Sequence, residues 1–461
     1  MRIYHLKNPV QRYAWGSVDG ISDTLGIPNP GGGPLAEIWM GAHPSAPSTA
    51  IIDGERIGLD ELVRRGPHEA LGSRVVDRLG SSLPFLFKVL SAGTPLSIQA
   101  HPSKRKAQIG YERENLGGIP VDAPERNYRD PNHKPEMAVA LTPFELICGF
   151  RPVAEIIENM RLVAPGEFAR SIERLERDPS RVELSVFFYN LISADERSRA
   201  QLLATVSKRA ADALEEKKVA PDREGAFRWA LRIMDIFPGD IGAILPLILN
   251  HIVLEPGEAA FIAPGELHAH LTGTCLEIMA NSDNVIRGAL TPKFIDLPEL
   301  VSVLSFNPER AHTVLPQAVG PCEEAYPIFV PDFELSRISV GPGRRCRRRS
   351  RGPEILLCVS GSAEILCTGK TVLSLGRGDT KSAERLMLER GDTKSAERLV
   401  LERGDTKSAE RLVLERGDTK SAERLVLERG EAAFAAADAC DYEIAADAPA
   451  LVFRASVPEI P

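Results

Sequence analysis

The pattern of apolar residues changes twice along this chain of 461 residues. In residues 1–150, short β-branched and aromatic runs alternate with Gly/Pro-rich breaks such as residues 29–34, which indicates strands and loops. From about residue 152 to 248, apolar residues recur every three or four positions and indicate helices. The strand pattern returns at Ile252 and continues from Phe333 to the end. We therefore predict a mainly β fold with an α-helical insert, in which strands on both sides of the insert complete one barrel.

Two β units are expected, because the chain is too long for one hydrophobic core and a short phrase occurs twice. Gly-Glu-Ala-Ala-Phe at residues 257–261 recurs at residues 430–434, each time next to a strand-like segment. The predicted units are a first barrel (1–151 and 250–305), a helical insert (152–249) and a second barrel (306–461). No histidine follows His312, so only the first barrel has imidazoles for a metal, and the second is predicted to be structural or a lid.

The amino-acid composition limits the kinds of binding partner that we expect. With 56 basic and 64 acidic residues the net charge is −8, which gives no electrostatic reason to expect nucleic acid or an anionic membrane. Apolar runs such as residues 241–249 are far shorter than the roughly 20 residues that span a bilayer, and the N-terminus lacks an apolar signal core. A soluble cytoplasmic protein is expected. The seven cysteines form no CxxC pair, so we predict buried, reduced thiols.

Residues 378–429 are a tandem repeat, four copies of a 13-residue segment that differ only by Met387. On one helix the Leu/Val clusters of successive copies would rotate around the axis, which argues against a single amphipathic helix. The alternatives are a Gly-Asp turn plus a short strand in each copy, or a mobile hairpin extension. We expect an insertion without catalytic role; an interaction surface is the alternative. The six arginines of residues 344–351 are interpreted as a solvated loop or barrel edge, or as an anion-binding patch.

The candidate chemistry lies in three segments of the first unit. Gln99 and His101 are two residues apart on a predicted strand and so project to one face. Pro135 favours extended geometry before it, which places Lys134 and Glu136 on one face as well. His268 lies on a glycine-bounded strand pair. Two imidazoles, a carboxylate and an amide suit zinc or another divalent first-row ion. The competing interpretation is that each is an ordinary polar group satisfied within a β-barrel.

A loop at the barrel mouth is expected at residues 281–288, where Asn, Ser, Asp and Arg are concentrated after an apolar stretch. Arg287 is always charged and forked, which suits an anionic substrate. The alternative is a structural ion pair between Arg287 and Asp283 or Asp296.

Several long segments together resemble the type I phosphomannose isomerase family, a zinc-dependent family of the cupin superfamily. They are LSIQAHPSK, NHKPEMAVAL, PGELHAHLTG, EIMANSDNVIRGALTPKFID, residues 13–16 and residues 36–44. The resemblance covers residues 1 to about 305 and is weaker beyond. It implies two cupin-type (jelly-roll) barrels and an isomerase that interconverts mannose 6-phosphate and fructose 6-phosphate through a cis-enediol, an activity of carbohydrate metabolism that includes GDP-mannose biosynthesis. One departure is His270, where the family usually has tyrosine.

The resemblance also implies residue roles. One Zn²⁺ per chain is held by Gln99, His101, Glu136 and His268. Arg287 and Lys134 are the working catalytic pair, Glu277 and Asp283 are further candidates for proton handling, and the substrate-binding candidates are Ser97, Lys104 and Lys88. The expected partner is a small-molecule sugar phosphate, with no nucleic acid and no membrane, and the chain is expected to be a monomer.

Two other functions compete. The first is an iron(II) dioxygenase, for which two histidines and a carboxylate are typical ligands, but a fourth protein ligand at Gln99 fills a position that oxygen chemistry needs open. The second is a sugar-phosphate-binding regulator without turnover. The complete set of predicted ligands argues against it.

Overall fold

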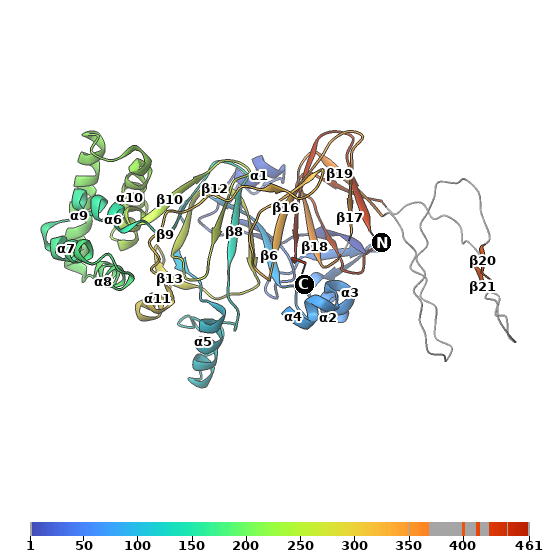
Figure 1. Ribbon diagram of the computed structural model, residues 1–461, viewed down its shortest axis with the longest axis horizontal. Helices are drawn as coiled ribbons and strands as arrows, with labels where there is room; N and C mark the ends of the chain where they lie inside the picture. Colours follow the sequence, from blue (N-terminus) through green and yellow to red (C-terminus); the bar gives the residue numbers. More distant parts are fainter. Residues whose placement is uncertain are drawn as a thin grey trace.

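The computed structural model describes residues 2–349, 351–367, 399–401, 412–414, 424–439 and 441–459. Within these ranges, every helix is too short or too polar to span a bilayer. In Figure 1 a group of helices lies at one end of the molecule, and two groups of strands follow it. The N- and C-termini both lie at the second group of strands.

The chain begins with short strands and short helices, as the Gly/Pro-rich breaks predict. The strands are β1 (Ile3–Lys7), β2 (Val10–Gln11), β3 (Glu37–Met40), β4 (Thr49–Ile52), β5 (Glu55–Gly58), β6 (Phe85–Ala92), β7 (Ile98–Ala100), β8 (Glu136–Ala140) and β9 (Phe144–Phe150). The helices are α1 (Gly20–Leu25), α2 (Leu59–Arg65), α3 (Pro67–Leu71), α4 (Ser73–Leu79) and α5 (Lys104–Leu116).

The helical periodicity after residue 152 corresponds to a helix cluster. It contains α6 (Val153–Val163), η1 (Gly166–Phe168), α7 (Ala169–Arg177), α8 (Arg181–Ile192), α9 (Glu196–Glu215), η2 (Pro221–Arg223), α10 (Glu224–Ile236) and η3 (Ile241–Leu247). Side chains of Ser180 and Asp195 cap α8 and α9 by accepting backbone N–H groups. The apolar faces of these helices form one core with Ile98, Ile147 and Leu271 of the adjacent sheet.

The sheet that carries the candidate site combines strands from before and after the helix cluster. The later strands are β10 (Leu249–Leu254), β11 (Ala259–Ile262), β12 (His268–Ala280) and β13 (Ile286–Ala289), and α11 (Leu297–Val303) follows them. All ten strands pair antiparallel, and the long strand β12 pairs with β6, β7, β8 and β9. Strands that lie more than a hundred positions before β12 in the sequence therefore become its direct neighbours in the sheet.

A second large sheet has nine strands, and its members come from both ends of the chain. They are β1, β4, β5, β14 (Gln317–Ala318), β15 (Glu323–Ala325), β16 (Glu334–Val340), β18 (Glu354–Ser360), β23 (Ala432–Ala435) and β25 (Ala450–Ser456). A four-stranded sheet of β17 (Arg345–Arg348), β19 (Ser362–Cys367), β22 (Arg424–Glu428) and β24 (Tyr442–Ala445) packs with it through a shared core. Thus β1, in the range 1–151, pairs with β23 near the C-terminus, and β4 and β5 extend the same sheet beyond β1.

The prediction of a mainly β chain that also carries helices is confirmed. The sheets are antiparallel, and the pairing among the described strands leaves each of them open rather than closed into a ring. The arginine-rich segment forms β17, an edge strand, and not a loop. Its Arg345 and Arg347 pair with Glu443 on β24, and Arg348 pairs with Glu323.

The expectation of reduced thiols is wrong for Cys322, Cys346 and Cys367, which are disulfide-bonded. Cys322 and Cys346 form a disulfide, with Cα atoms 6.2 Å apart. Cys322 directly precedes β15 and Cys346 lies on β17, and the sheet packing brings them together in a way that their separation of 24 residues does not reveal. Cys148, Cys275 and Cys358 are free and buried, as predicted.

Most of the tandem repeat lies outside the described residues. The described parts are β20 (Leu399–Leu401), β21 (Leu412–Leu414) and β22, which fall at the same Leu-Val-Leu positions of the second, third and fourth copies. These positions agree with the alternative of a short strand in each copy. The first copy, residues 378–390, is not described.

Candidate metal centre and cavity

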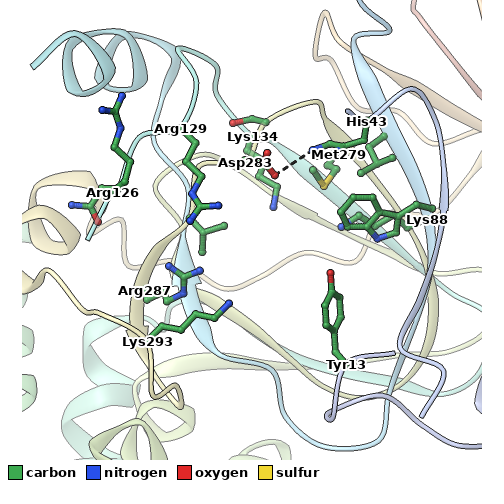
Figure 2. A pocket seen from close by; sticks show the side chains of 15 residues that line it. Tyr13, His43, Lys88, Arg126, Arg129, Lys134, Met279, Asp283, Arg287 and Lys293 are labelled. Carbon is green, nitrogen blue, oxygen red and sulfur yellow. Dashed lines mark ion pairs between the residues drawn. The ribbon is translucent and has the colours of Figure 1, made fainter. Parts of the chain in front are cut away.

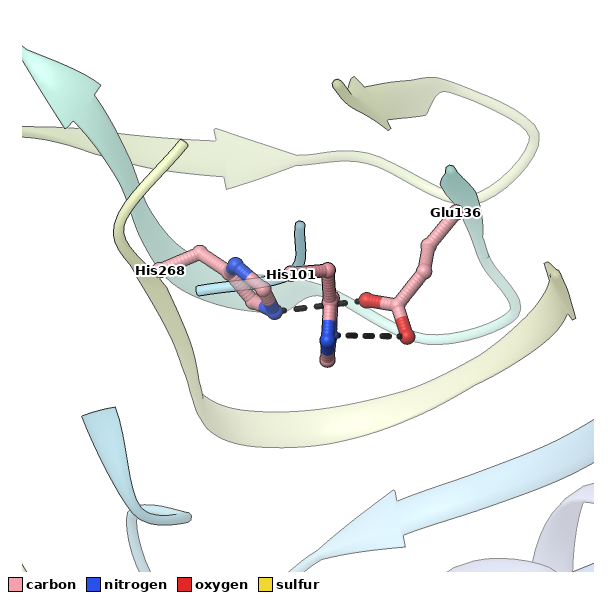
Figure 3. Close-up of side chains that lie close together, drawn as sticks. All are labelled: His101, Glu136 and His268. Atoms are coloured by element: carbon pink, nitrogen blue, oxygen red, sulfur yellow. Dashed lines mark ion pairs between the residues drawn. The ribbon is translucent and has the colours of Figure 1, made fainter. Parts of the chain in front are cut away.

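Three buried side chains, His101, Glu136 and His268, converge beside the centre of the ten-stranded sheet (Figure 3). Glu136 is the first residue of β8, His268 is the first residue of β12, and His101 directly follows β7. One ligand atom from each lies within 4.8 Å of the others. The spacing suits a single metal ion, and the sequence prediction that these three residues meet agrees with this geometry.

Each imidazole is oriented by a backbone carbonyl. His101 Nδ1 lies 2.7 Å from the carbonyl oxygen of Asn284, and His268 Nδ1 lies 3.0 Å from that of Glu266. When Nδ1 donates its hydrogen in this way, the lone pair of Nε2 is left for a metal. Both Nε2 atoms are buried without a hydrogen-bond partner. A divalent ion would satisfy these two nitrogen atoms, so the donor set fits a metal.

The carboxylate of Glu136 faces both nitrogen atoms, at 3.3 Å from His101 Nε2 and 3.2 Å from His268 Nε2. Burial and the nearby Lys134 ammonium lower the pKa of His101 to about 4. Burial alone would raise the pKa of Glu136, but the Lys134 ammonium and the two imidazoles hold it well below its usual range. At neutral pH His101 and Glu136 are thus in the deprotonated forms that bind metal.

Gln99, the fourth predicted ligand, lies on the same face of the sheet as His268. The two residues are directly opposite each other in the β7–β12 pairing, and Gln99 is also opposite Arg287 in the β7–β13 pairing. Directly opposed residues of antiparallel strands project to one side. The position is therefore suitable for a ligand, and its role stays a prediction.

Lys134 connects the metal centre to a cavity of about 270 Å³ (Figure 2). Its Nζ lies 2.9 Å from Glu136 Oε1, and its side chain also lines the cavity, so Lys134 and Glu136 share a face as the Pro135 geometry predicts. The cavity wall is strongly cationic. Its basic residues are Lys88, Arg126, Arg129, Lys134, Arg287 and Lys293.

A buried ion network supports the wall behind the cavity. Lys88 Nζ lies 3.1 Å from Glu277 Oε2 and 3.6 Å from Glu37 Oε1. Burial alone would lower the pKa of Lys88, but Glu37 and Glu277 raise it, and Lys88 in turn lowers the pKa of Glu277 against the effect of burial. The network therefore keeps both groups charged.

His270, the departure from the family pattern, is buried behind this network. Its ring packs edge-on against Phe144, its Nδ1 lies 3.8 Å from Glu277 Oε1, and neither ring nitrogen has a hydrogen-bond partner. Burial lowers the pKa of His270 and favours the neutral ring.

Arg287 is half-buried in the cavity wall, and burial next to Arg129 lowers its pKa. Within the described part of the chain, neither acid of the competing interpretation pairs with it. Asp283 pairs with His43, and Asp296 caps α11 and accepts from Asn127. Its guanidinium is therefore available to an anionic ligand, as are Arg129 and Lys293 nearby.

Two of the predicted substrate-binding residues, Ser97 and Lys104, are not part of the cavity lining. Lys104 is exposed at the start of α5, where it donates to Asn132, and Ser97 is half-buried in the loop before β7. Three residues of the cavity lining were not predicted from the sequence: Arg129, Lys293 and His43. His43 and Lys293 lie in the segments quoted for the resemblance, but nothing in those segments alone distinguishes cavity residues from their neighbours.

The fold and site define a protein with a candidate metal centre beside a cationic cavity, as expected of a metal-dependent enzyme. Comparison with known proteins identifies the kind of enzyme: residues 3–153 match the family model for the catalytic domain of type I phosphomannose isomerase. Mannose-6-phosphate isomerase of Salmonella typhimurium is 40% identical over 368 residues (78% of this chain, 89% of the relative), and the human enzyme is 37% identical over 366 residues (74% and 83%). The chain belongs to the type I phosphomannose isomerase family.

Solved structures agree with this assignment. A variant of phosphomannose isomerase from Salmonella typhimurium aligns with a TM-score of 0.80 at 33% identity, covering 99% of this chain and 100% of the other. A zinc-bound mannose 6-phosphate isomerase aligns with a TM-score of 0.79 at 34% identity and the same coverage. The predicted family is therefore confirmed.

Proposed function

We propose that this chain is a zinc-dependent isomerase that interconverts D-mannose 6-phosphate and D-fructose 6-phosphate by proton transfer through a cis-enediol. The observation that carries the proposal is the pair of buried, unpartnered imidazole nitrogens facing Glu136, next to a cationic cavity. Membership of the family and the zinc-bound neighbouring structures support the choice of substrate and metal.

One Zn²⁺ would be held by His101, Glu136 and His268, with Gln99 as the fourth ligand. When bound, the ion would supply a Lewis acid for the isomerisation. The side chains of the protein stabilise charge and transfer the proton. Arg287 stabilises negative charge that develops on the sugar oxygens. Lys134 Nζ lies at the boundary of the metal centre and the cavity, where the neutral amine takes the proton from C2 and the resulting ammonium returns it to C1. Glu277 and Asp283 are further candidates for this proton transfer.

The phosphate group needs several cations or N–H donors because it carries close to two negative charges. Arg129, Arg287 and Lys293 form such a group at one side of the cavity (Figure 2). Lys88 lines the opposite part of the wall and binds the sugar. Ser97 and Lys104 do not line the cavity, so we propose that they make only weaker contacts with the substrate, at the edge of the site.

The remaining parts of the proposal concern architecture and cellular context. The two β regions are proposed as cupin-type barrels, with units at 1–151 and 250–305, 152–249 and 306–461. The chain is proposed to act as a cytoplasmic monomer.

The test is an assay of the purified chain with mannose 6-phosphate, followed by detection of fructose 6-phosphate. We expect turnover that stops after removal of metal by a chelator and returns when zinc is added. A chain that contains zinc but forms no fructose 6-phosphate would contradict the proposed function. Oxygen consumption with iron would favour the dioxygenase alternative.

A further inference from the structure

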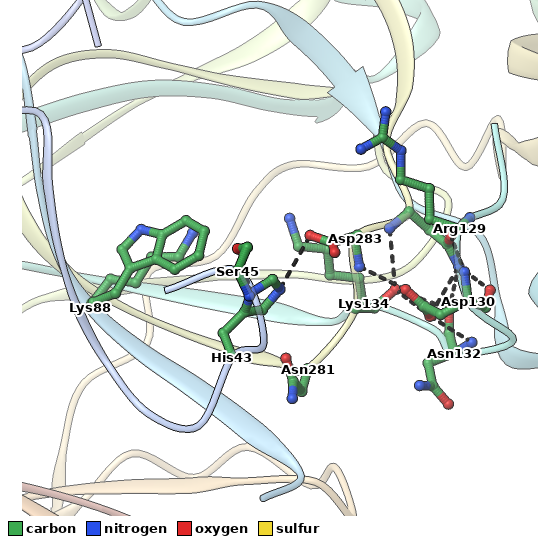
Figure 4. Close-up of polar contacts among 12 residues, drawn as sticks. His43, Ser45, Lys88, Arg129, Asp130, Asn132, Lys134, Asn281 and Asp283 are labelled. Carbon is green, nitrogen blue, oxygen red and sulfur yellow. Dashed lines mark hydrogen bonds and ion pairs between the residues drawn. The ribbon is translucent and has the colours of Figure 1, made fainter. Parts of the chain in front are cut away.

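One cavity residue, His43, has no role in the function proposed above. Its imidazole is buried, lines the cavity and packs edge-on against Trp39, with ring centroids 5.0 Å apart. Its Nε2 lies 3.2 Å from Asp283 Oδ1, and its Nδ1 lies 2.8 Å from the Ser45 hydroxyl oxygen (Figure 4). His43 thus lies between Ser45 and the cavity carboxylate.

The backbone determines which nitrogen of His43 carries the hydrogen. The main-chain N–H of Ser45 donates to His43 Nδ1 at 3.3 Å. A backbone N–H can only donate, so Nδ1 must be an acceptor and the hydrogen of the neutral ring lies on Nε2. That N–H group points at Asp283, and the Ser45 hydroxyl can donate to Nδ1 as well.

Asp283 is the only acidic side chain among the described residues that line this cavity. The cations Lys134 and Arg129 are near enough to lower its pKa, after the larger effect of the hydrogen bond from His43. A free carboxylate in such a position can turn toward either cation. Its backbone is held by Asp130, which accepts from the Asp283 N–H at 2.7 Å, and its side chain is held by His43 (Figure 4).

We propose that His43, with its tautomer set by Ser45, is a positioning residue that holds the Asp283 carboxylate toward the cavity, where it accepts a hydrogen bond from a hydroxyl group of the bound sugar. This inference rests on the proposed function. In the proposed function, the metal centre next to Lys134 would receive the carbonyl end of the sugar, and Arg129, Arg287 and Lys293 would receive the phosphate. The wall between them must therefore contact hydroxyl groups, and a fixed carboxylate distinguishes their positions.

The test is a double-mutant cycle with zinc-loaded enzyme. His43→Phe keeps a ring against Trp39 but removes the N–H donor, and we expect kcat/KM for mannose 6-phosphate to fall about ten-fold to one-hundred-fold. Asp283→Ala is expected to lose at least as much, and adding His43→Phe to it is expected to cost little more. His43→Gln places an amide N–H near the Nε2 position and is expected to recover most of the activity.

Ser45→Ala and His5→Ala are the controls. Ser45→Ala keeps the main-chain N–H that determines the tautomer, so we expect less than about a three-fold change. His5 makes a similar histidine–carboxylate contact, 3.2 Å from Glu431, outside the cavity, and its loss should leave kcat/KM unchanged.

Three results would overturn the inference while leaving the function intact: wild-type activity in His43→Phe, independent losses that multiply in the double variant, or no recovery in His43→Gln that folds and binds zinc. If the wild-type chain itself converts no mannose 6-phosphate, the proposed function fails first and the inference fails with it.

Discussion

The two large sheets share the same turn, but the buried polar groups that follow it differ. In both copies of Gly-Glu-Ala-Ala-Phe the glycine has a positive φ, +92° at Gly257 and +86° at Gly430, which favours glycine. In both, the glutamate that follows donates its backbone N–H to a carbonyl three residues earlier, and its carboxylate accepts from that residue's N–H. The repeated phrase therefore marks a repeated structure.

The strand register shows which residue of the second sheet corresponds to the glutamate of the metal centre. The residue after the phrase is Ile262 in one sheet, opposite Glu136, and Ala435 in the other, opposite Glu354. Glu354 thus occupies the position of the metal-centre glutamate. Two residues further along these strands, Ala138 is opposite Glu277 and Leu356 is opposite Arg454. An acid in the first sheet corresponds to an arginine in the second.

This difference decides what each buried glutamate binds. Arg454 donates to Glu354 at 3.0 Å, to Glu323 at 3.1 Å and to Glu334 at 2.8 Å, and the Tyr442 hydroxyl also donates to Glu354. Glu136 instead faces two imidazole nitrogens that lack partners. The second glutamate is paired with a guanidinium, whereas the first faces two nitrogen atoms that fit a divalent ion. We therefore expect the first network to serve function and the second to serve stability.

The largest expected effect is on the first glutamate. Glu136→Ala should remove zinc and lower kcat/KM at least about 10³-fold, since it deletes a ligand. The matched variant Glu354→Ala should keep its zinc and its activity in the folded fraction. Metal content and kcat/KM of the two purified variants check this. Loss of zinc in Glu354→Ala, or retained activity in Glu136→Ala, would contradict the separation of roles.

Strand alternation made Gln99, His101, Glu136 and His268 candidate ligands but left ordinary polar groups as the alternative, and the resemblance to the family then favoured the metal centre. The sequence did not allow prediction of contacts set by long-range register. Ile3 pairs with Ala435, and no local pattern reveals that β1 joins the second sheet. The same holds for the Cys322–Cys346 disulfide, for His43 beside Asp283, and for Arg454 opposite Leu356. The repeated phrase predicted two related units, but not that an arginine replaces an acid within them.

The second-largest expected effect is on the stability of the folded protein when Arg454 is replaced. Arg454→Met removes the central cation from a buried cluster and leaves Arg348 as the cation that still pairs with Glu323 and Glu354. Breaking a buried ion network in this way costs about 3–5 kcal/mol. We expect a clearly lowered denaturation midpoint with unchanged zinc content, measured by chemical denaturation of the holoenzyme. An unchanged midpoint would show that the network does not stabilise the second sheet.

Arg287 provides the opposite case, an arginine without an ion pair in the described structure. Arg287→Ala should retain zinc and lower kcat about 10²- to 10³-fold, the usual cost of losing a charged group at a developing oxyanion. Its stability should hardly change, because removing it relieves repulsion from Arg129. Turnover at the wild-type rate would refute its assigned role and weaken the contrast with Arg454.

The smallest effect tests whether the exposed arginines of β17 share the stabilising role of Arg454. The Glu443 side chain is buried, but its partners Arg345 and Arg347 are 62% and 87% exposed. Burial alone would raise the pKa of Glu443, yet the two arginines hold it below its usual value.

A depressed folded-state pKa contributes stability above the unfolded-state pKa, near 4.5, and that stability is lost as the pH falls through the folded-state value. Because solvent screens exposed pairs, Glu443→Gln should cost no more than about 1 kcal/mol at pH 7, and the difference from wild type should disappear in acid. Denaturation midpoints at pH 7 and below pH 4 measure this. A difference that persists in acid would mean that Glu443 acts through packing rather than charge.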